Sequence, residues 1–276
     1  MDRQTEITTP GALLNEKGDL ARPGFSRALV QEYRRADVKV SPLRIKEWDY
    51  YLVNNGKFAL ALTVADNGYM GLDSVSLLDL EEGWEITKSP MSFMPLGKKH
   101  LPETSVTGDV HSAAHGYGIH FIHEGEKRVL IAYMNKFGES ALSARVELTE
   151  CPEDSLVIAT PFDKPGHFYY NQKIVGFRAS GYVNYNGKTY TFEPSDSFAV
   201  LDWGRGVWTY ENTWYWSSAA YVLPSGTPFG WNLGYGFGDT SAASENMLFH
   251  AGTAHKLGGI KFEIPGEAEG KERYTE

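Results

Sequence analysis

Short runs of apolar and β-branched residues, each closed by a turn signal, follow one another along the chain from about residue 44 onward. The clearest runs lie at residues 47–53, 57–66, 129–137 and 143–150. Runs of this length and composition are typical of β-strands. Asn-Asn-Gly at 54–56 and Asn-Gly at 186–187 mark tight hairpin turns, because Asn and Gly tolerate a positive φ. The pattern predicts an all-β fold made of consecutive antiparallel hairpins.

The first 40 residues follow a different pattern. Pro10 and Pro23, each followed by a glycine, interrupt any long element. The segment 26–37, SRALVQEYRRAD, begins with a capping serine and continues with good helix formers. It therefore predicts one short N-terminal helix, and we expect residues 1–40 to form an extension ahead of the strands.

A meander of antiparallel strands must close on itself or pack face to face, because exposed strand edges recruit other strands. The candidate strands are too many for one small barrel, so we expect two barrel-like units, over residues 41–180 and 181–276. The last candidate strand ends before Pro265, and an acidic, polar tail follows it. The sequence thus predicts either a frayed end or a second barrel that is incomplete.

Composition narrows the choice of partners and compartment. The chain has 276 residues, 42% of them hydrophobic, which is sufficient for a large core. Its 26 basic and 35 acidic residues give a net charge of −9, which disfavours nucleic acid and anionic membrane surfaces. The sequence shows neither a secretory signal pattern nor an apolar run of about 20 residues that could insert into a membrane. Because Cys151 is the sole cysteine and cannot form an internal disulfide, we expect a cytoplasmic protein.

Tryptophan is concentrated in one stretch of the sequence. Five of the seven tryptophans fall within 29 residues: Trp203, Trp208, Trp214, Trp216 and Trp231. Alternate residues of a strand share a face, so Trp214 and Trp216 are expected to point the same way. This density predicts an aromatic wall along one cavity. The alternative is a wide barrel core filled with large rings.

Polar residues are embedded in this aromatic stretch. Asp202 and Arg205 flank Trp203, and Glu245 lies in an otherwise apolar segment. A carboxyl group surrounded by aromatic rings is poorly solvated, so its pKa rises and it can donate a proton near neutral pH. We therefore predict Asp202 and Glu245 as catalytic acids or bases. In the alternative interpretation, Arg205 pairs with Asp202 or Glu245 and the group is structural.

The remaining predicted ligand contacts surround these acids or lie at a barrel mouth. They are Trp203, Arg205, Trp208, Trp214, Trp216, Trp231, Asn232, Tyr235 and Asn246, together with Glu47 and Trp48. Glu47 and Asp73 could orient a hydroxyl or amine of the ligand. Otherwise they are solvated residues at strand ends.

Other chemistries find little support in the sequence. The histidines at 111, 115, 120 and 123 crowd together, but the glycines among them disfavour a helical metal pair, and exposed hairpin histidines are the simpler interpretation. The run GWNLGYGFG lacks the lysine and the helix of a phosphate-binding loop. A nucleophile elbow of the form G-x-S-x-G is missing as well. We predict no metal and no cofactor.

Several motifs resemble a known family. DWGRGVW, GWNLGYGFG, ENMLFHAGTAHKL, RIKEWDYY and GYMGLDSVSLLDLE are similar to the bacterial family known as domain of unknown function 2804. More distantly, Asp-Trp-Gly and Trp-Tyr-Trp resemble elements of the lipocalin-like group of AttH, carotenoid hydratases and tocopherol cyclases. The resemblance implies two tandem lipocalin-like β-barrels and an apolar small molecule as ligand. It also implies that Asp202 occupies the position of a proton donor.

These observations lead to one preferred hypothesis. We expect a protein that binds a hydrophobic small molecule, a terpenoid or lipid, with acid-assisted hydration, cyclisation or isomerisation. Tryptophan faces would stabilise the carbocation that forms. A binding protein without catalysis and a carbohydrate-binding protein are the alternatives. The oligomeric state stays open.

Overall fold

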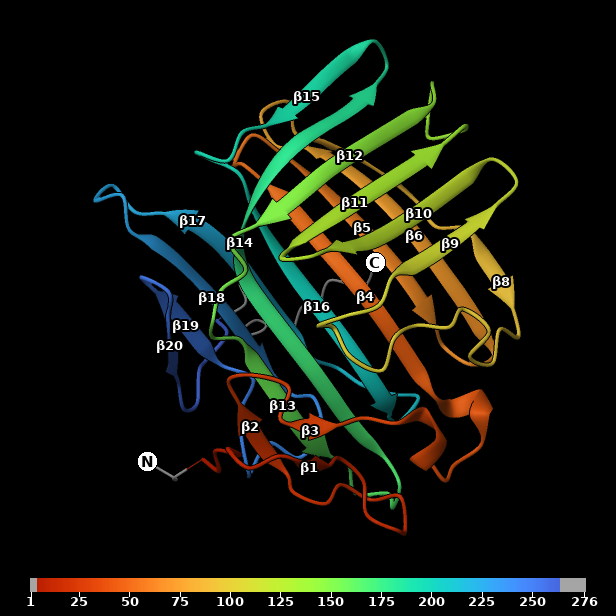
Figure 1. Cartoon of the computed structure of the whole chain (residues 1–276), viewed down its shortest axis with the longest axis vertical. Helices are drawn as coiled ribbons and strands as arrows, with labels where there is room; N and C mark the ends of the chain where they lie inside the picture. The colour runs from red at the N-terminus through yellow and green to blue at the C-terminus, as the bar shows by residue number, and fades with distance from the viewer. Residues whose placement is uncertain (1–3, 264–276) are drawn as a thin grey trace.

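The computed structural model describes residues 4–263, and it is built from strands (Figure 1). The main path of a large sheet runs in the order β7 (Trp84–Lys88), β6 (Met70–Asp79), β5 (Phe58–Asp66), β4 (Lys46–Asn54), β16 (Phe198–Val207), β14 (Phe168–Tyr185), β12 (Leu142–Thr149), β11 (Lys127–Met134), β10 (Tyr117–Glu124) and β9 (Val110–Ala114). Four strands attach beside this path: β8 (Met91–Phe93) on β6, β15 (Lys188–Phe192) and β13 (Leu156–Pro161) on β14, and β2 (Gly24–Ser26) on β13.

Two further sheets complete the architecture. The small sheet has the order β17 (Tyr215–Val222), β18 (Pro228–Tyr235), β19 (Met247–His250) and β20 (Thr253–Lys256). A short parallel pair joins β1 (Gly11–Ala12) and β3 (Gln31–Glu32). Within residues 4–263, no helix has the length and apolar character needed to cross a membrane.

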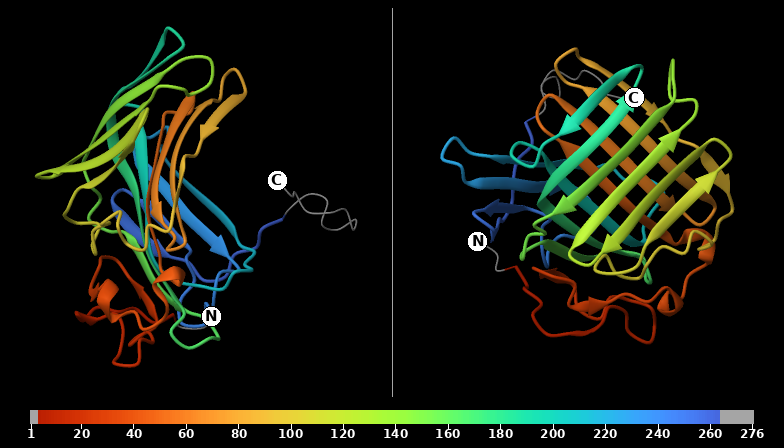
Figure 2. Two further views of the ribbon diagram at one scale, coloured as in Figure 1. Left: turned by 90° about the vertical axis from the view of Figure 1, so that its right-hand side faces the viewer. Right: turned by 45° about the horizontal axis from the view of Figure 1, so that its top comes forward.

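The large sheet curls into a half-barrel (Figure 2). Tyr51 on β4 and Phe121 on β10 meet across its concave side, with ring centroids 4.7 Å apart. The convex side of β14 and β16 is covered by the small sheet. The lipocalin-like, all-β fold predicted from the sequence is therefore confirmed. The turn at Asn186 and Gly187, where both residues have positive φ, joins β14 to β15 as predicted.

Side chains alternate along each central strand, so each strand contributes residues both to the concave core and to the layer beneath the small sheet. On β4, the residues at odd positions from 47 to 53 are buried in the concave core, whereas Trp48 and Tyr50 point to the convex side. On β16, Trp203 and Arg205 face the concave core and Asp202 faces the small sheet. One stretch of sequence is thus divided between two environments.

The predicted N-terminal helix is wrong. Phe25 and Ser26 form strand β2 on β13, and Gln31 pairs with Gly11 in the parallel bridge. Among residues 4–40 the only helical turn is the 3₁₀ turn Arg35–Asp37, and a second 3₁₀ turn, Pro42–Arg44, follows just after the extension. Long-range strand pairing outweighs the modest helix propensity of this segment.

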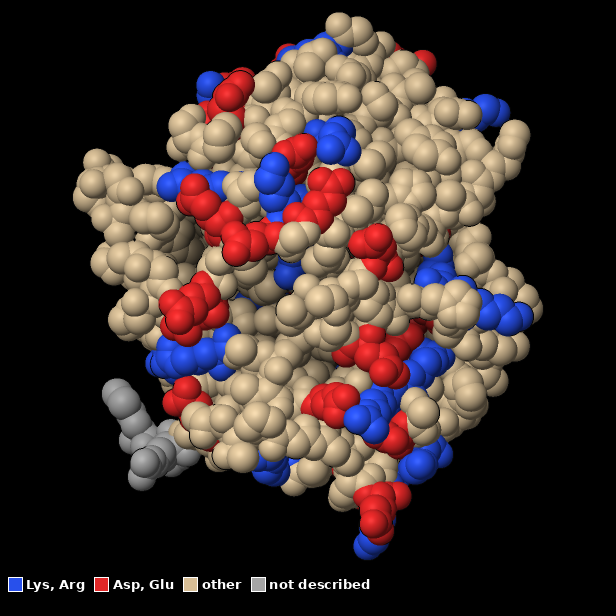
Figure 3. All heavy atoms as spheres, in the orientation of Figure 1, with Lys and Arg blue, Asp and Glu red and all other residues tan. Residues whose placement is uncertain are grey.

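The predicted division of the chain at residue 180 stays a prediction. Strand β14 continues through this position, and β16 and β15 belong to the large sheet. The predicted frayed tail from residue 265 lies outside the described residues. On the face shown in Figure 3, basic and acidic side chains are interspersed.

Candidate functional site

Asp202 lies in the layer between the two sheets. It sits on β16 opposite Lys173 of β14 and Tyr50 of β4, and only 9% of its surface is exposed. Its carboxylate forms an ion pair with Lys173 and accepts hydrogen bonds from Asn171 Nδ2 at 2.6 Å and Trp48 Nε1 at 3.1 Å. Three donors from three different side chains therefore converge on this buried acid.

Glu245 is a second buried acid, and the segment just before β19 carries it. Its Oε2 is buried and has no hydrogen-bond partner in the described structure. The side chain lies over Gly234, where a Cβ would be only 2.3 Å from Glu245 Cδ. Burial raises the pKa of Glu245 to about 7; the charge of Asp202 adds to this effect and that of Lys173 opposes it. Glu245 can therefore hold a proton near neutral pH.

Two asparagines fix the frame around Glu245. Asn232 accepts a hydrogen bond from Trp216 Nε1 at 2.8 Å and donates one to the backbone oxygen of Glu245 at 2.8 Å. Asn246 accepts from the backbone N–H of Gly234 and donates to the carbonyl of residue 258. Both amides are satisfied by the protein, so they position the acid.

We call Asn171, Lys173, Asp202, Asn232 and Glu245 the inter-sheet cluster. The charges of its two acids reach the neighbouring phenols. The pKa of Tyr50 is raised to about 12 by burial and by Asp202, and that of Tyr169 is raised by burial and by both acids. Lys173 Nζ lies 4.8 Å from the centroid of the Trp216 ring. The arrangement combines a carboxyl that can carry a proton, a charged ion pair and an aromatic face.

Three predicted residues face the concave core instead. Trp203 meets Tyr170 there, with centroids 5.8 Å apart. Arg205 donates from Nη2 to Asp49 at 2.9 Å, so the predicted pairing of Arg205 with Asp202 or Glu245 is wrong. Glu47 accepts from the Tyr33 hydroxyl at 2.8 Å and forms an ion pair with Arg35. The period of two along a strand separates these side chains from the cluster.

The other predicted aromatic contacts are spread along the convex side. Trp48 and Trp208 meet edge to face at 5.2 Å, beside Tyr169. Trp214 lies against Phe237 but is 46% exposed. Trp231 donates from Nε1 to Ser217 Oγ, and Tyr235 is 61% exposed. Trp48 and Trp216 are therefore the indoles that touch the inter-sheet cluster.

Sequence reasoning missed Asn171 and Lys173. Both lie in the run FYYNQKIVGF, whose polar centre stands between apolar residues. A lysine that is 2% exposed in the middle of a long strand requires a buried partner. The polar residues inside this apolar run were therefore the sequence signal for a buried polar site.

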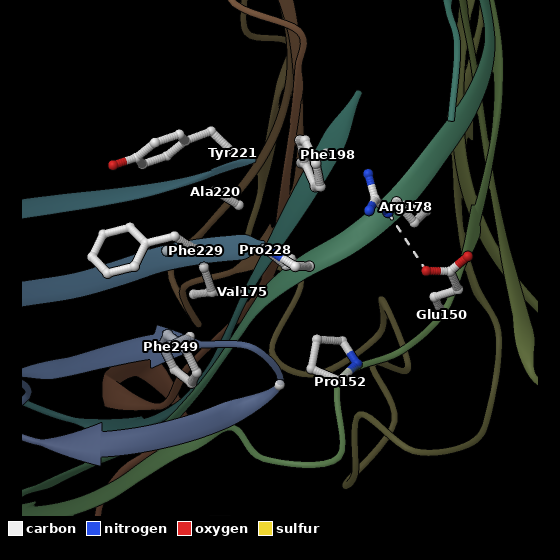
Figure 4. A pocket seen from close by; sticks show the side chains of 13 residues that line it. Glu150, Pro152, Val175, Arg178, Phe198, Ala220, Tyr221, Pro228, Phe229 and Phe249 are labelled. Atoms are coloured by element: carbon white, nitrogen blue, oxygen red, sulfur yellow. Dashed lines mark ion pairs between the residues drawn. The ribbon is translucent and has the colours of Figure 1, made fainter. Parts of the chain in front are cut away.

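A small apolar cavity opens at one end of the same layer (Figure 4). Its volume is about 170 Å³, and its walls include Val175, Phe198, Phe229 and Phe249. Val175 follows Lys173 by two positions on β14, so both side chains point toward the small sheet. The ion pair between Arg178 Nε and Glu150 Oε2, at 3.5 Å, lies at its border.

The histidine-rich hairpin brings one pair together. His111 Nδ1 and His120 Nδ1 are 3.1 Å apart, and Asp109 lies 3.8 Å from His111 Nε2. His123 points into the concave side. Among the described residues, no group of three or more His, Cys, Asp or Glu side chains is arranged to hold a metal ion.

Comparison with known proteins defines the family. The model of the family described as domain of unknown function (DUF2804) matches residues 4–272. The chain belongs to this family. No curated protein sequence matches it.

Solved structures resemble the chain at low sequence identity, and the first of those that follow supports the fold. A protein assigned as AttH from Nitrosomonas europaea is 14% identical, with a TM-score of 0.50 over 81% of this chain and 71% of that protein. Kievitone hydratase from Nectria haematococca is 10% identical, with a TM-score of 0.39 over 76% of this chain and 63% of the hydratase. CghA, solved with Sch210972, is 12% identical, with a TM-score of 0.39 over 89% of this chain and 68% of CghA.

Proposed function

We propose that this DUF2804 protein binds an apolar small molecule, a terpenoid or lipid, between its two sheets and applies acid–base chemistry to it. The reaction class is hydration, cyclisation or isomerisation at a carbon–carbon double bond. The observation that carries the proposal is the buried, unpartnered Oε2 of Glu245 beside an ion pair and an aromatic face. A buried polar atom without a partner is rare in folded proteins and is found at functional sites.

The contacts support distinct roles for the two acids. Glu245, whose pKa is near 7, is the proton donor. Asp202 is held by three donors, and its ion pair with Lys173 fixes its side chain beside the site. This assignment shifts the donor role from Asp202, predicted from the sequence, to Glu245.

The proposed reaction conserves atoms and charge. The Glu245 carboxyl gives its proton to one alkene carbon, which leaves a carbocation on the other. The π-faces of Trp48 and Trp216 stabilise this cation, by about 1–2 kcal/mol per desolvated ring. In hydration, water then bonds to the cation and loses a proton to the Glu245 carboxylate. In cyclisation, an internal alkene bonds to the cation, and the new cation loses a neighbouring proton to the Glu245 carboxylate. In isomerisation, the first cation loses a different neighbouring proton to the same carboxylate.

Native mass spectrometry of the purified protein tests the binding step by revealing a bound apolar molecule. The recovered molecule is then incubated with the protein in D₂O. We expect deuterium in the product, and a loss of turnover of about 100-fold or more in Glu245→Gln, whose ligand occupancy stays unchanged. Glu263→Gln, at an exposed side chain paired with Lys261, is the matched control. A molecule that binds but returns unlabelled would leave only a binding function.

The binding-protein alternative has its own support. The Lys173–Asp202 ion pair joins neighbouring strands and would be needed for folding in either case. Asp202→Asn keeps the shape and removes the charge. A lower unfolding free energy with unchanged turnover in the folded variant would assign this pair to structure alone. Carbohydrate binding stays a prediction, checked by a change in tryptophan fluorescence on adding oligosaccharides.

A further inference from the structure

Arg128 is a buried cation on the concave side of the half-barrel. It lies on β11 and is 7% exposed. Its Nη1 donates to the Tyr51 hydroxyl at 2.9 Å, and its guanidinium carbon lies 4.9 Å from the centroid of the Phe177 ring. Both partners are neutral, and no carboxylate among residues 4–263 forms an ion pair with Arg128. Buried charges in proteins are normally paired with an opposite charge.

The neighbouring acids are committed to other cations. Asp49, the buried carboxylate whose charge reaches Arg128, is bonded to Arg205 at 2.9 Å. Glu47 is paired with Arg35. An arginine cannot lose its proton at ordinary pH, so Arg128 stays charged without a carboxylate of its own among residues 4–263.

A cavity of about 520 Å³ lies beside Arg128, which forms part of its wall. This volume is within the usual range for small-molecule sites. The polar part of the wall contains Ser105, His123 and Gln172, and the apolar part contains Leu29 and Ile174. His123 Nδ1 is buried and has no hydrogen-bond partner in the described structure. The cavity therefore joins an unpaired cation to an apolar surface.

We propose that this cavity binds a small monocarboxylate. The carboxylate pairs with the free edge of the Arg128 guanidinium, and the hydrocarbon part lies on Leu29 and Ile174. The exposed Lys127 also lines the cavity, as do three exposed acids, Glu126, Glu150 and Glu153. These acids disfavour a phosphate or a dicarboxylate, whose larger negative charge they would repel. One negative charge on an apolar body is the ligand chemistry that fits.

Calorimetric titration of the full chain with octanoate, octanol and octyl phosphate tests the proposal. Octanoate is expected to bind at least ten times more tightly than octanol or octyl phosphate. In Arg128→Met, octanoate affinity falls about 10- to 100-fold, the usual loss for a charge-assisted pair. Arg145→Met, on neighbouring β12 with its side chain 42% exposed, is the matched control and leaves affinity unchanged. Equal binding of octanoate and octanol, or full octanoate affinity in Arg128→Met, overturns the proposal.

A second variant protects the test against misfolding. Arg128→Lys keeps the charge but loses the planar fork of the guanidinium. Octanoate affinity is therefore expected to fall only about fivefold, so binding stays measurable. Without ligand, the thermal midpoint of Arg128→Met is expected to equal or exceed that of the wild type, because the substitution removes a buried charge that lacks a carboxylate of its own within residues 4–263. A large drop of the midpoint would assign Arg128 to structure. Glu245→Gln lies on the other side of the sheet and leaves octanoate binding unchanged, so this proposal and the proposed function fail separately.

Discussion

Charged side chains are buried on both sides of the central strands, but the group left without an ion-pair partner among the described residues differs between the two sides. Toward the small sheet, the inter-sheet cluster holds one ion pair and an extra acid, Glu245, which can become neutral by keeping a proton. On the concave side, Asp49 and Arg205 pair and Arg128 is left over. A surplus carboxyl can be neutralised from within, whereas a surplus guanidinium requires an anion from outside. The comparison teaches that a surplus charged group is neutralised by a proton where it can titrate, and calls for a counter-ion where it cannot, as with arginine.

Lys173→Met should produce the largest effect in this comparison. It leaves Asp202 buried without its cation, so we expect the free energy of unfolding to fall by about 3–5 kcal/mol. Arg128→Met leaves no buried carboxylate without its cation, so it should change the free energy of unfolding by less than about 1 kcal/mol. Urea unfolding of both variants measures the difference. Lys127→Met, at an exposed pair with Glu147, is the control and should stay within about 0.5 kcal/mol of wild type. Equal losses at positions 173 and 128 would remove the contrast between the two layers.

The stored proton should appear in the pH dependence of stability. The folded protein holds the Glu245 proton up to about pH 7, whereas the carboxyl of the unfolded chain titrates near 4.5. The stabilisation is complete below pH 4.5 and is lost as the pH rises through 7, a decrease of about 3 kcal/mol.

Unfolding of wild type and Glu245→Gln at pH 5 and pH 7.5 measures this effect. The glutamine variant should lose less stability over this interval, because it has no proton to release. The groups that act on Glu245, namely Lys173, Asp202 and Lys256, stay in place in both proteins. Burial lowers the pKa of Lys256 to about 7, so this group increases the stability of the folded protein only as the pH rises above 7. Parallel pH profiles for the two proteins would show that Glu245 stores no proton.

Gly204→Ala tests how closely the convex side is packed. A Cβ at this position would lie 2.1 Å from Trp48 Cζ2, so the indole must move away from Asp202. We expect a loss of about 2 kcal/mol in unfolding free energy. Gly259→Ala, where nothing lies within 4 Å of the added atom, is the control. A neutral effect at Gly204 would mean that the layer is loose enough to accept a ligand without rearrangement.

The smallest expected effect belongs to Trp216→Phe. The ring face over Lys173 remains, but the hydrogen bond to Asn232 is lost, which should cost about 1 kcal/mol. Thermal unfolding measures it, and Trp214→Phe, at a half-exposed ring, is the control. A loss well above that of one hydrogen bond would indicate that Trp216 also holds Glu245 in place through Asn232.

Local signals in the sequence predict the fold well because hairpins are local. The turn at Asn186 and Gly187 and the alternation along β4 were both readable from neighbouring residues. The false helix at 26–37 has the opposite origin, because its partners lie outside the segment. Ser26 pairs with Val157 of β13, some 130 positions further along the chain, and Gln31 pairs with Gly11 of β1. No pattern within the segment reports either pairing.

The candidate site could be predicted only in part. Buried acids in the aromatic stretch were expected, and the structure buries both Asp202 and Glu245. The identity of their partners depends on which strands become neighbours. Lys173 reaches Asp202 because β14 pairs with β16, and Arg205 turns away because it lies an odd number of positions from Asp202. Composition and spacing contain neither fact.

The small sheet has one more consequence, which concerns access. Within residues 4–263 no β-ladder links it to the half-barrel; the two meet through side chains and a few loop contacts. If it swings outward, each ladder stays intact, so a molecule can reach Glu245 without either sheet unravelling. Access to Glu245 therefore depends on the side-chain packing between the sheets and not on strand pairing.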